Sequence, residues 1–214
     1  MAPPPQEVHR TPVVITAASP PRAPAAPGVD GAPERFVLMF NWLVDRNTMP
    51  EAPALGMEVA GGPTWSGAHW RLRALGGLSY FMSQRTPFMY GLPQGDMQLF
   101  NASSRGCLTV VAGRFEIGPC AGAELAVMHV SSVDGATFMD PTQHWLSLLG
   151  SVAMSWRVYS AVAIFGRFEV VKPTAVRTFN MADDMFRDSA SVWLVYRLPD
   201  IAARGAVGLE LRFW

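Results

Sequence analysis

Residues 201–214 read "IAARGAVGLELRFW", and the alternation in this stretch decides the fold class. From Ile201 onward the odd positions are apolar or small, and they end in Leu209, Leu211 and Phe213. The even positions include the charged residues Arg204, Glu210 and Arg212. Because successive side chains of a β-strand point to opposite faces, this period of two predicts a strand with one apolar and one charged face. The apolar face then meets either a protein core or lipid.

The composition narrows the classes of protein that fit. The chain has 214 residues, of which 50% are hydrophobic and only 16% are charged, against about 25% charged in a typical soluble domain. The formal net charge is zero, which argues against a nucleic-acid partner. No stretch approaches the ~18 uninterrupted apolar residues of a membrane helix. We therefore look for a single domain built from strands.

The first 34 residues differ in composition from the rest. Residues 1–34 are rich in Pro and Ala, which predicts a disordered tail or periplasmic linker before a β-barrel at residues 35–214. The run "PVVIT" is too short for the core of a signal peptide, and no basic segment precedes it. Export would therefore need a signal upstream of Met1.

Seven more runs resemble the last strand, and no run predicts a helix. The expected strands cover residues 35–46, 54–62, 69–82, 96–111, 114–130, 144–158 and 160–171. The run at 96–111 alternates poorly. Pro119 cannot donate a ladder hydrogen bond, so we expect a β-bulge or a local edge there.

The connections between these runs alternate in length. Long connections are expected at residues 47–53, 83–95, 131–143 and 172–199, and short ones at 63–67, 112–114 and 157–159. Outer-membrane barrels have long external loops and tight periplasmic turns. A soluble meander has no reason to place every long loop at one end, so this order favours a membrane barrel.

The charged face of the runs points the same way. It collects five acids and seven bases, namely Glu58, Glu116, Glu124, Glu169, Glu210, Arg71, Arg73, Arg114, Arg157, Arg167, Arg204 and Arg212. Unpaired charge is too costly for the dry core of a soluble sandwich. In a small membrane barrel, apolar side chains face lipid while charges pair inside a narrow lumen. The alternative is the solvent face of an ordinary antiparallel sheet.

We therefore predict an all-β fold, an eight-stranded antiparallel up-and-down transmembrane β-barrel in a bacterial outer membrane. The set above without Arg114 is the predicted lumen charge network. Aromatic residues near the expected strand ends suggest interface girdles; these are Trp42, Trp65, Trp70, Trp145, Trp156, Tyr159, Phe213 and Trp214.

The two cysteines flank the expected tight turn at residues 112–114. If the turn is centred between Gly113 and Arg114, paired residue numbers sum to 227, and Cys107 then faces Cys120. Opposed residues have a Cα separation that a disulfide accepts. The alternative is two small buried thiols. No base stands beside either cysteine, and two Cys with four scattered His make no metal site, so we expect no metal and no cofactor.

The C-terminal half resembles a group of uncharacterised, predicted outer-membrane β-barrel proteins from myxobacteria. The shared features are the paired cysteines with Pro119 before the second, "GAEL" at 122–125, "WL" at 145–146, and an ending Arg-x-x-x-Gly-x-x-x-Arg-Phe at 204–213. The resemblance covers about residues 106–214 and, more loosely, 35–105. It implies eight strands, an outer-membrane location and a Pro-rich segment before the barrel. It implies no biochemical activity. The terminal aromatic read by the barrel-assembly machinery would be Phe213 or Trp214.

The leading function hypothesis is a small, monomeric, non-porin outer-membrane protein with a structural or binding role. Its partners would be outer-membrane lipids, the barrel-assembly machinery and an unidentified ligand of the external loops, especially residues 172–193. A lumen filled by Arg–Glu pairs should conduct solutes poorly, and no catalytic residues are expected.

Two alternatives come from other functional classes. One is a lipid-modifying enzyme in which His129, near the external end of its strand and close to His144, works with Ser131 or Ser132. Such catalysis needs serine and base within hydrogen-bond reach and a third group that orients the base. The other is a soluble lipocalin-like barrel, which needs an apolar interior and a polar exterior.

Overall fold

The protein is described from a computed structural model that defines residues 35–49, 53–85, 95–132, 137–138, 141–175, 178–182 and 192–214. The predicted tail at residues 1–34 and parts of the long loops lie outside these ranges. Among the residues that the structure describes, no helix has the length and hydropathy needed to cross a bilayer.

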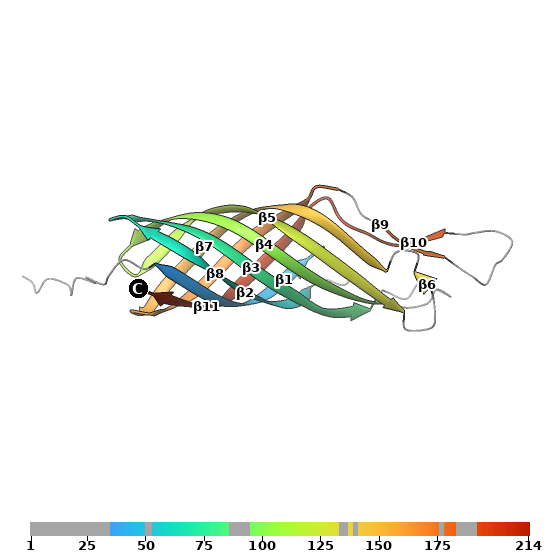
Figure 1. Ribbon diagram of the computed structural model, residues 1–214, viewed down its shortest axis with the longest axis horizontal. Helices are drawn as coiled ribbons and strands as arrows, with labels where there is room; N and C mark the ends of the chain where they lie inside the picture. The colour runs from blue at the N-terminus through green and yellow to red at the C-terminus, as the bar shows by residue number, and fades with distance from the viewer. Residues whose placement is uncertain are drawn as a thin grey trace, which may run out of the picture. The chain divides into compact units, whose positions relative to one another are not determined.

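Eight antiparallel strands close into a barrel in which each strand pairs with its neighbours along the chain (Figure 1). They are β1 Phe36–Arg46, β2 Ala54–Ser66, β3 Trp70–Arg85, β4 Gly95–Ala112, β5 Phe115–Ser132, β7 Thr142–Tyr159, β8 Val162–Pro173 and β11 Ala202–Phe213. The first strand pairs with the last from Phe36↔Phe213 to Arg46↔Ala203. The predicted fold is confirmed, and the stretch at 201–214 forms the strand that closes the barrel.

The connections also follow the predicted order of long and short. Between barrel strands, residues 67–69, 113–114 and 160–161 are short, whereas residues 47–53, 86–94, 133–141 and 174–201 are long. The turn from β4 to β5 has two residues, and its Gly113 has a φ of 63°. A left-handed backbone of this kind favours glycine because it has no Cβ to clash. We call the two ends of the barrel the short-turn end and the loop end.

A second, three-stranded sheet is built from two of the long connections. It contains β6 Thr137–Phe138, β9 Thr178–Ala182 and β10 Val192–Arg197, in the order β10-β9-β6. The lengths of the runs predicted loops at these residues, and the sheet was not predicted. Within the connection from β8 to β11, β9 and β10 therefore pair as antiparallel strands.

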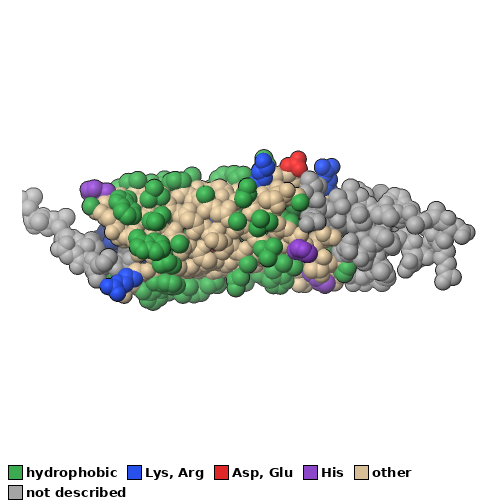
Figure 2. All heavy atoms as spheres, turned by 45° about the horizontal axis from the view of Figure 1, so that its top comes forward, with side chains coloured by type: hydrophobic (Ala, Val, Ile, Leu, Met, Phe, Trp, Pro, Cys, Tyr) green, Lys and Arg blue, Asp and Glu red, His purple; other side chains and the backbone are tan. Residues whose placement is uncertain are grey.

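The outside of the barrel is apolar and the inside is charged. Large hydrophobic side chains point outward from every strand, for example Leu78, Trp42 and Val207 with exposed fractions of 69%, 61% and 57%. The face drawn in Figure 2 has hydrophobic and uncharged side chains along the middle of the barrel, with charged side chains nearer its ends. This is the polarity of a barrel that meets lipid.

Aromatic side chains form a ring around the short-turn end. Its exposed members are Phe36, Trp65, Trp70, Phe115, Trp156, Tyr159, Phe213 and Trp214. Phe115 stacks on Trp156 with ring centroids 5.9 Å apart. Such a ring is typical of the boundary between hydrocarbon and headgroups. Two predicted members lie elsewhere. Trp42 is exposed on β1 opposite Val207, away from this ring, and Trp145 is 3% exposed and points inward because its neighbour Leu146 takes the outward phase.

Of the two outcomes predicted at Pro119, the structure has the local edge and not the β-bulge. The pairs Cys107↔Cys120 and Val110↔Ile117 share one register, so no residue is inserted between them. Pairing with β4 is interrupted only between these pairs, whereas Pro119 still lies opposite Val152 of β7. Since proline has no amide hydrogen, the ladder loses contacts locally while the strand stays in register.

The polarity of the wall inverts near the loop end. Beyond Phe100, Val127 and Leu146, the outward positions of β4, β5 and β7 carry polar side chains, such as Gln98, His129, Thr142 and His144. The inward positions there are apolar and almost fully buried, with Met97, Leu99, Met128 and Trp145 at 0–3% exposure. These three strands have 18 residues each, whereas ~9–11 residues cross a bilayer. The inversion marks the level at which the wall leaves hydrocarbon.

Candidate functional site

The lumen is the most elaborate polar region of the molecule. Seven arginines and six acids are buried there: Arg71, Arg73, Arg105, Arg157, Arg167, Arg204, Arg212, Asp45, Glu58, Glu116, Glu124, Glu169 and Glu210. None of them is more than 9% exposed. Isolated buried charges are very costly, so their value to the fold depends on how they pair. They pair in two clusters.

The first cluster lies at the short-turn end and is centred on Glu116. This carboxylate accepts hydrogen bonds from Arg212 at 2.6 Å and from Arg73 at 2.7 Å, and it also pairs with Arg71. Arg157 approaches it at 3.5 Å. Arg73 and Arg212 also reach Glu210, at 2.9 and 2.7 Å. Residues on β3, β5, β7 and β11 are thereby linked across the lumen.

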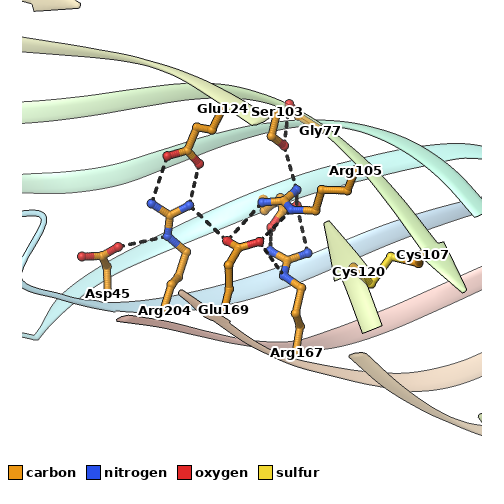
Figure 3. Close-up of polar contacts among 11 residues, drawn as sticks. Asp45, Gly77, Ser103, Arg105, Cys107, Cys120, Glu124, Arg167, Glu169 and Arg204 are labelled. Carbon is orange, nitrogen blue, oxygen red and sulfur yellow. Dashed lines mark hydrogen bonds and ion pairs between the residues drawn. A yellow bond between two sulfur atoms is a disulfide. The ribbon is translucent and has the colours of Figure 1, made fainter. Parts of the chain in front are cut away.

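The second cluster lies nearer the loop end, and Figure 3 shows part of it. Arg204 of β11 stands between Asp45 at 3.0 Å and Glu124 at 2.6 Å, and it reaches Glu169 at 3.5 Å. Its guanidinium also lies 5.0 Å from the centre of the Phe81 ring. Arg204 therefore ties β11 to β1, β5 and β8, and contacts the apolar residues above.

The rest of this cluster is a ring of alternating charge. Arg105 binds Glu169 at 2.8 Å and Glu58 at 2.9 Å. Arg167 binds Glu58 at 2.5 Å and approaches Glu169 at 3.5 Å. Each carboxylate therefore has two or more arginines, which offsets the cost of removing it from water.

A disulfide-containing apolar layer separates the two clusters. Cys107 and Cys120 are bonded, lie opposite each other in the β4–β5 ladder, and are 4% and 5% exposed. They form one buried cluster with Val37, Met39, Ala60, Leu75, Ala153 and Phe165. The barrel wall is thus cross-linked at the level where the lumen carries no ion pair among the described residues.

An apolar cap closes the loop end of the lumen. Its buried members include Leu43, Met49, Phe81, Met97, Leu99, Met128, Val130, Trp145 and Leu198. Met49 and Leu198 come from the connections, and the others come from strands. From the short-turn end, the described residues of the lumen therefore form ionic, apolar, ionic and apolar layers.

The structure places all eleven residues of the predicted charge network in the lumen and brings them into these two clusters. The assignment of Arg114 to the same face was wrong, because it lies exposed in the β4–β5 turn. Sequence reasoning missed Asp45 and Arg105. Arg105 has the phase of Cys107 and Thr109, but the surrounding Gly and Ser residues obscured the alternation. Asp45 is recognisable only once the register places it opposite Arg204.

His129, the candidate base of a lipid-modifying enzyme, does not have the serine partner that nucleophilic catalysis needs among the described residues. His129 is exposed on the outer wall, and its Nδ1 lies 2.9 Å from the Thr142 hydroxyl. Ser131 donates a hydrogen bond of 3.4 Å to the backbone carbonyl of Asp96. His144 is exposed on β7, and Ser132 is the last residue of β5. No Ser–His hydrogen bond links described residues.

Two further positions complete the predicted set. Phe213 and Trp214 are 46% and 47% exposed, at the end of β11 and just beyond it, so they belong to the aromatic ring. Within the described ranges, no three His, Cys, Asp or Glu side chains are grouped so as to hold a metal ion.

Comparison with known proteins finds likeness in structure alone. No protein-family model and no curated protein sequence matches the chain. A major outer membrane protein from Thermus thermophilus has a TM-score of 0.55 at 13% identity, covering 84% of this chain and 98% of that one. Ail, the attachment invasion locus protein of Yersinia pestis, in complex with the heparin analogue sucrose octasulfate, has a TM-score of 0.50 at 11% identity, covering 84% and 97%.

Neisserial surface protein A is similar at a TM-score of 0.49 and 12% identity, covering 83% of this chain and 97% of that one. At identities this low, the likeness to the Thermus protein and to the Ail complex shows the fold alone, that of a small outer-membrane barrel.

Proposed function

We propose that the protein is a small, non-conducting barrel of a bacterial outer membrane that acts through structure or through binding at its loop end. The observation that carries this proposal is the layered filling of the lumen by two ionic clusters, the disulfide layer and the apolar cap. A lumen filled in this way is unsuited to solute flow. The surface left for recognition is the loop end, where the wall extends beyond the hydrocarbon level.

Membrane fractionation with a heat-modifiability gel tests the location and the folded state together. We expect the full chain in the outer-membrane fraction, with faster migration in SDS without boiling than after boiling. Recovery of the folded chain in a soluble fraction, without detergent, would argue for a soluble barrel instead. That alternative has no support in the burial pattern, which is the reverse of what a lipocalin needs.

Planar-bilayer recording tests the absence of conduction. We predict no stable conductance steps after insertion of the purified chain, because charged side chains and the apolar cap fill the lumen. Insertion itself is checked by the heat-modifiable band of protein recovered from the same vesicles. A large and stable conductance would contradict the proposal.

The lipid-modifying enzyme is the second candidate, and it rests on the outward position of His129 beside Ser131. Replacement of His129 with Ala should leave the acyl composition of outer-membrane lipids unchanged, because Ser131 already binds a backbone carbonyl and His129 binds Thr142. Mass spectrometry of lipids from cells with wild type, variant or no barrel measures this. An acyl pattern that appears with wild type and disappears with His129→Ala would establish the enzyme.

The remaining assignments are part of the same proposal. Phe213 or Trp214 would supply the terminal aromatic that the barrel-assembly machinery reads, and membrane lipids would surround a monomer. The likeness to myxobacterial barrel proteins, based on residues such as Cys107 and Cys120, is a further part of this proposal.

A further inference from the structure

The outer wall has a hollow on β3, β4 and β5. On neighbouring strands the directly opposed residues Leu78, Ala102 and Leu125 form a row that is large, small and large. The next row toward the loop end contains Phe100 and Val127. These five side chains line an apolar cavity of about 230 Å³ on β3, β4 and β5. It is smaller than the ~300–1,000 Å³ of pockets that enclose a drug-sized ligand. Its size suits part of one hydrocarbon chain.

We call this cavity the groove. The wall next to it on the side of the short-turn end is nearly smooth. The next outward row contains Gly76, Ser104 and Ala123, and the one after it contains Ala74, Gly106 and Ala121, which is followed by Gly150 on β7. An added Cβ at Gly76, Gly106 or Gly150 would meet nothing. A flexible apolar chain that enters the groove can therefore continue along the wall toward the middle of the barrel without obstruction.

A polar row lies directly above the groove. Gln98 faces His129, each two residues beyond the Phe100↔Val127 pair, and Thr142 lies next to His129 on β7. The Thr142 hydroxyl lies 2.9 Å from Nδ1 of His129. Nε2 of His129 makes no hydrogen bond to another described residue. Asp96, two residues before Gln98 on the same face of β4, pairs with Arg85 at 3.4 Å. The row can thus donate hydrogen bonds to an acceptor-rich group.

We propose that the groove binds one acyl chain of an outer-leaflet lipid and that Gln98 and His129 bind the phosphate of its headgroup. The inference rests on the proposed function, since it places the loop end outside and the groove in the outer leaflet. The occupant is a lipid because the site is apolar within the hydrocarbon level and becomes polar where that level ends. A second copy of the chain would bury the polar row against hydrocarbon-facing residues.

The test is native mass spectrometry of the full chain, delipidated in detergent and titrated with phosphatidylglycerol. Wild type should retain one lipid beyond a statistical distribution of adducts. Ala102→Phe fills the groove and should weaken this retention by about tenfold, and Ser104→Leu should weaken it by obstructing the wall below. His129→Ala should lower retention of phosphatidylglycerol while the fold is unchanged.

Val207→Phe is the matched control, because Val207 is an outward residue of β11, and its partners Trp42 and Gly166 belong neither to the groove nor to the smooth wall below it. It should retain the lipid as wild type does. Equal retention by wild type and Ala102→Phe, or a dimer that Ala102→Phe dissociates, would overturn the inference. Every variant is first checked for heat-modifiable insertion into phosphatidylcholine vesicles, since failure of wild type there refutes the proposed function instead.

Discussion

Replacement of Arg204 with Met should lower the free energy of unfolding by about 3–5 kcal/mol, the range measured when one partner of a buried ion pair is removed. Arg204 holds Asp45 at 3.0 Å and Glu124 at 2.6 Å, and both carboxylates are at most 2% exposed. The variant leaves these two charges buried without their cation, while Met retains most of the packing volume. Urea titration in lipid vesicles, read from the heat-modifiable band, measures the change.

Arg85→Met is the matched control for this experiment. The Arg85 side chain is 66% exposed and lies 3.4 Å from Asp96, and an exposed pair contributes only ~0–1 kcal/mol. Asp45→Asn and Glu124→Gln in the Arg204→Met background neutralise the two carboxylates that have lost their arginine. They should recover part of the lost free energy of unfolding. Equal effects of Arg204→Met and Arg85→Met would mean that the lumen is hydrated and that its ion pairs do little for the fold.

An arginine on the outer face of the wall should lower the free energy of unfolding when it lies at the middle of the hydrocarbon level. Val207 is the sixth residue of β11 and is 57% exposed, so Val207→Arg puts a charge into hydrocarbon. We expect a loss of about 2–4 kcal/mol in the free energy of unfolding, as found for arginine at the midplane of membrane barrels. The same urea titration in vesicles measures it.

The control places the same side chain above the hydrocarbon level. Thr142 is exposed at the loop end of β7, and Thr142→Arg should cost about 0–1 kcal/mol, as at a membrane interface. A soluble barrel would tolerate both substitutions equally, because both positions would then face water.

Much of the fold could be predicted because two signals are local. Alternation along each run fixed which side chains share a face, and the spacing of runs fixed the order of long and short connections. The last strand shows this most clearly, since Leu209 and Glu210 occupy opposite faces as expected. The Cys107↔Cys120 register also followed from the centre of a two-residue turn.

What could not be predicted depends on contacts that no single run contains. Arg105 lies in a strand rich in Gly and Ser, where a weak alternation hides the inward phase. The partners of Arg204 come from β1, β5 and β8, and they are known only when the barrel closes.

The loop-end features were hidden by a similar cause. On β4, β5 and β7 the inward positions change from polar to apolar near the loop end. Trp145 has the inward phase of Ser147 and Arg157, and only its position near the strand end suggested an interface girdle. The small sheet of β6, β9 and β10 consists of short strands from distant connections, and each is too short for a periodic signal of its own. The groove likewise needs three neighbouring strands in register before Ala102 stands between Leu78 and Leu125.

Collision accessibility of nitroxide labels in vesicles tests most directly whether the apolar face of the barrel wall meets lipid. Labels are attached to single cysteines at Val207 and Leu209, with Thr142 as the site outside the belt. The native Cys107 and Cys120 do not interfere, because they are bonded to each other. Because the outer face of the wall meets lipid, lipid-dissolved oxygen should reach the labels at 207 and 209, and a water-soluble nickel chelate should reach only the label at 142. Nickel access at 207 and 209 without oxygen enrichment would contradict it.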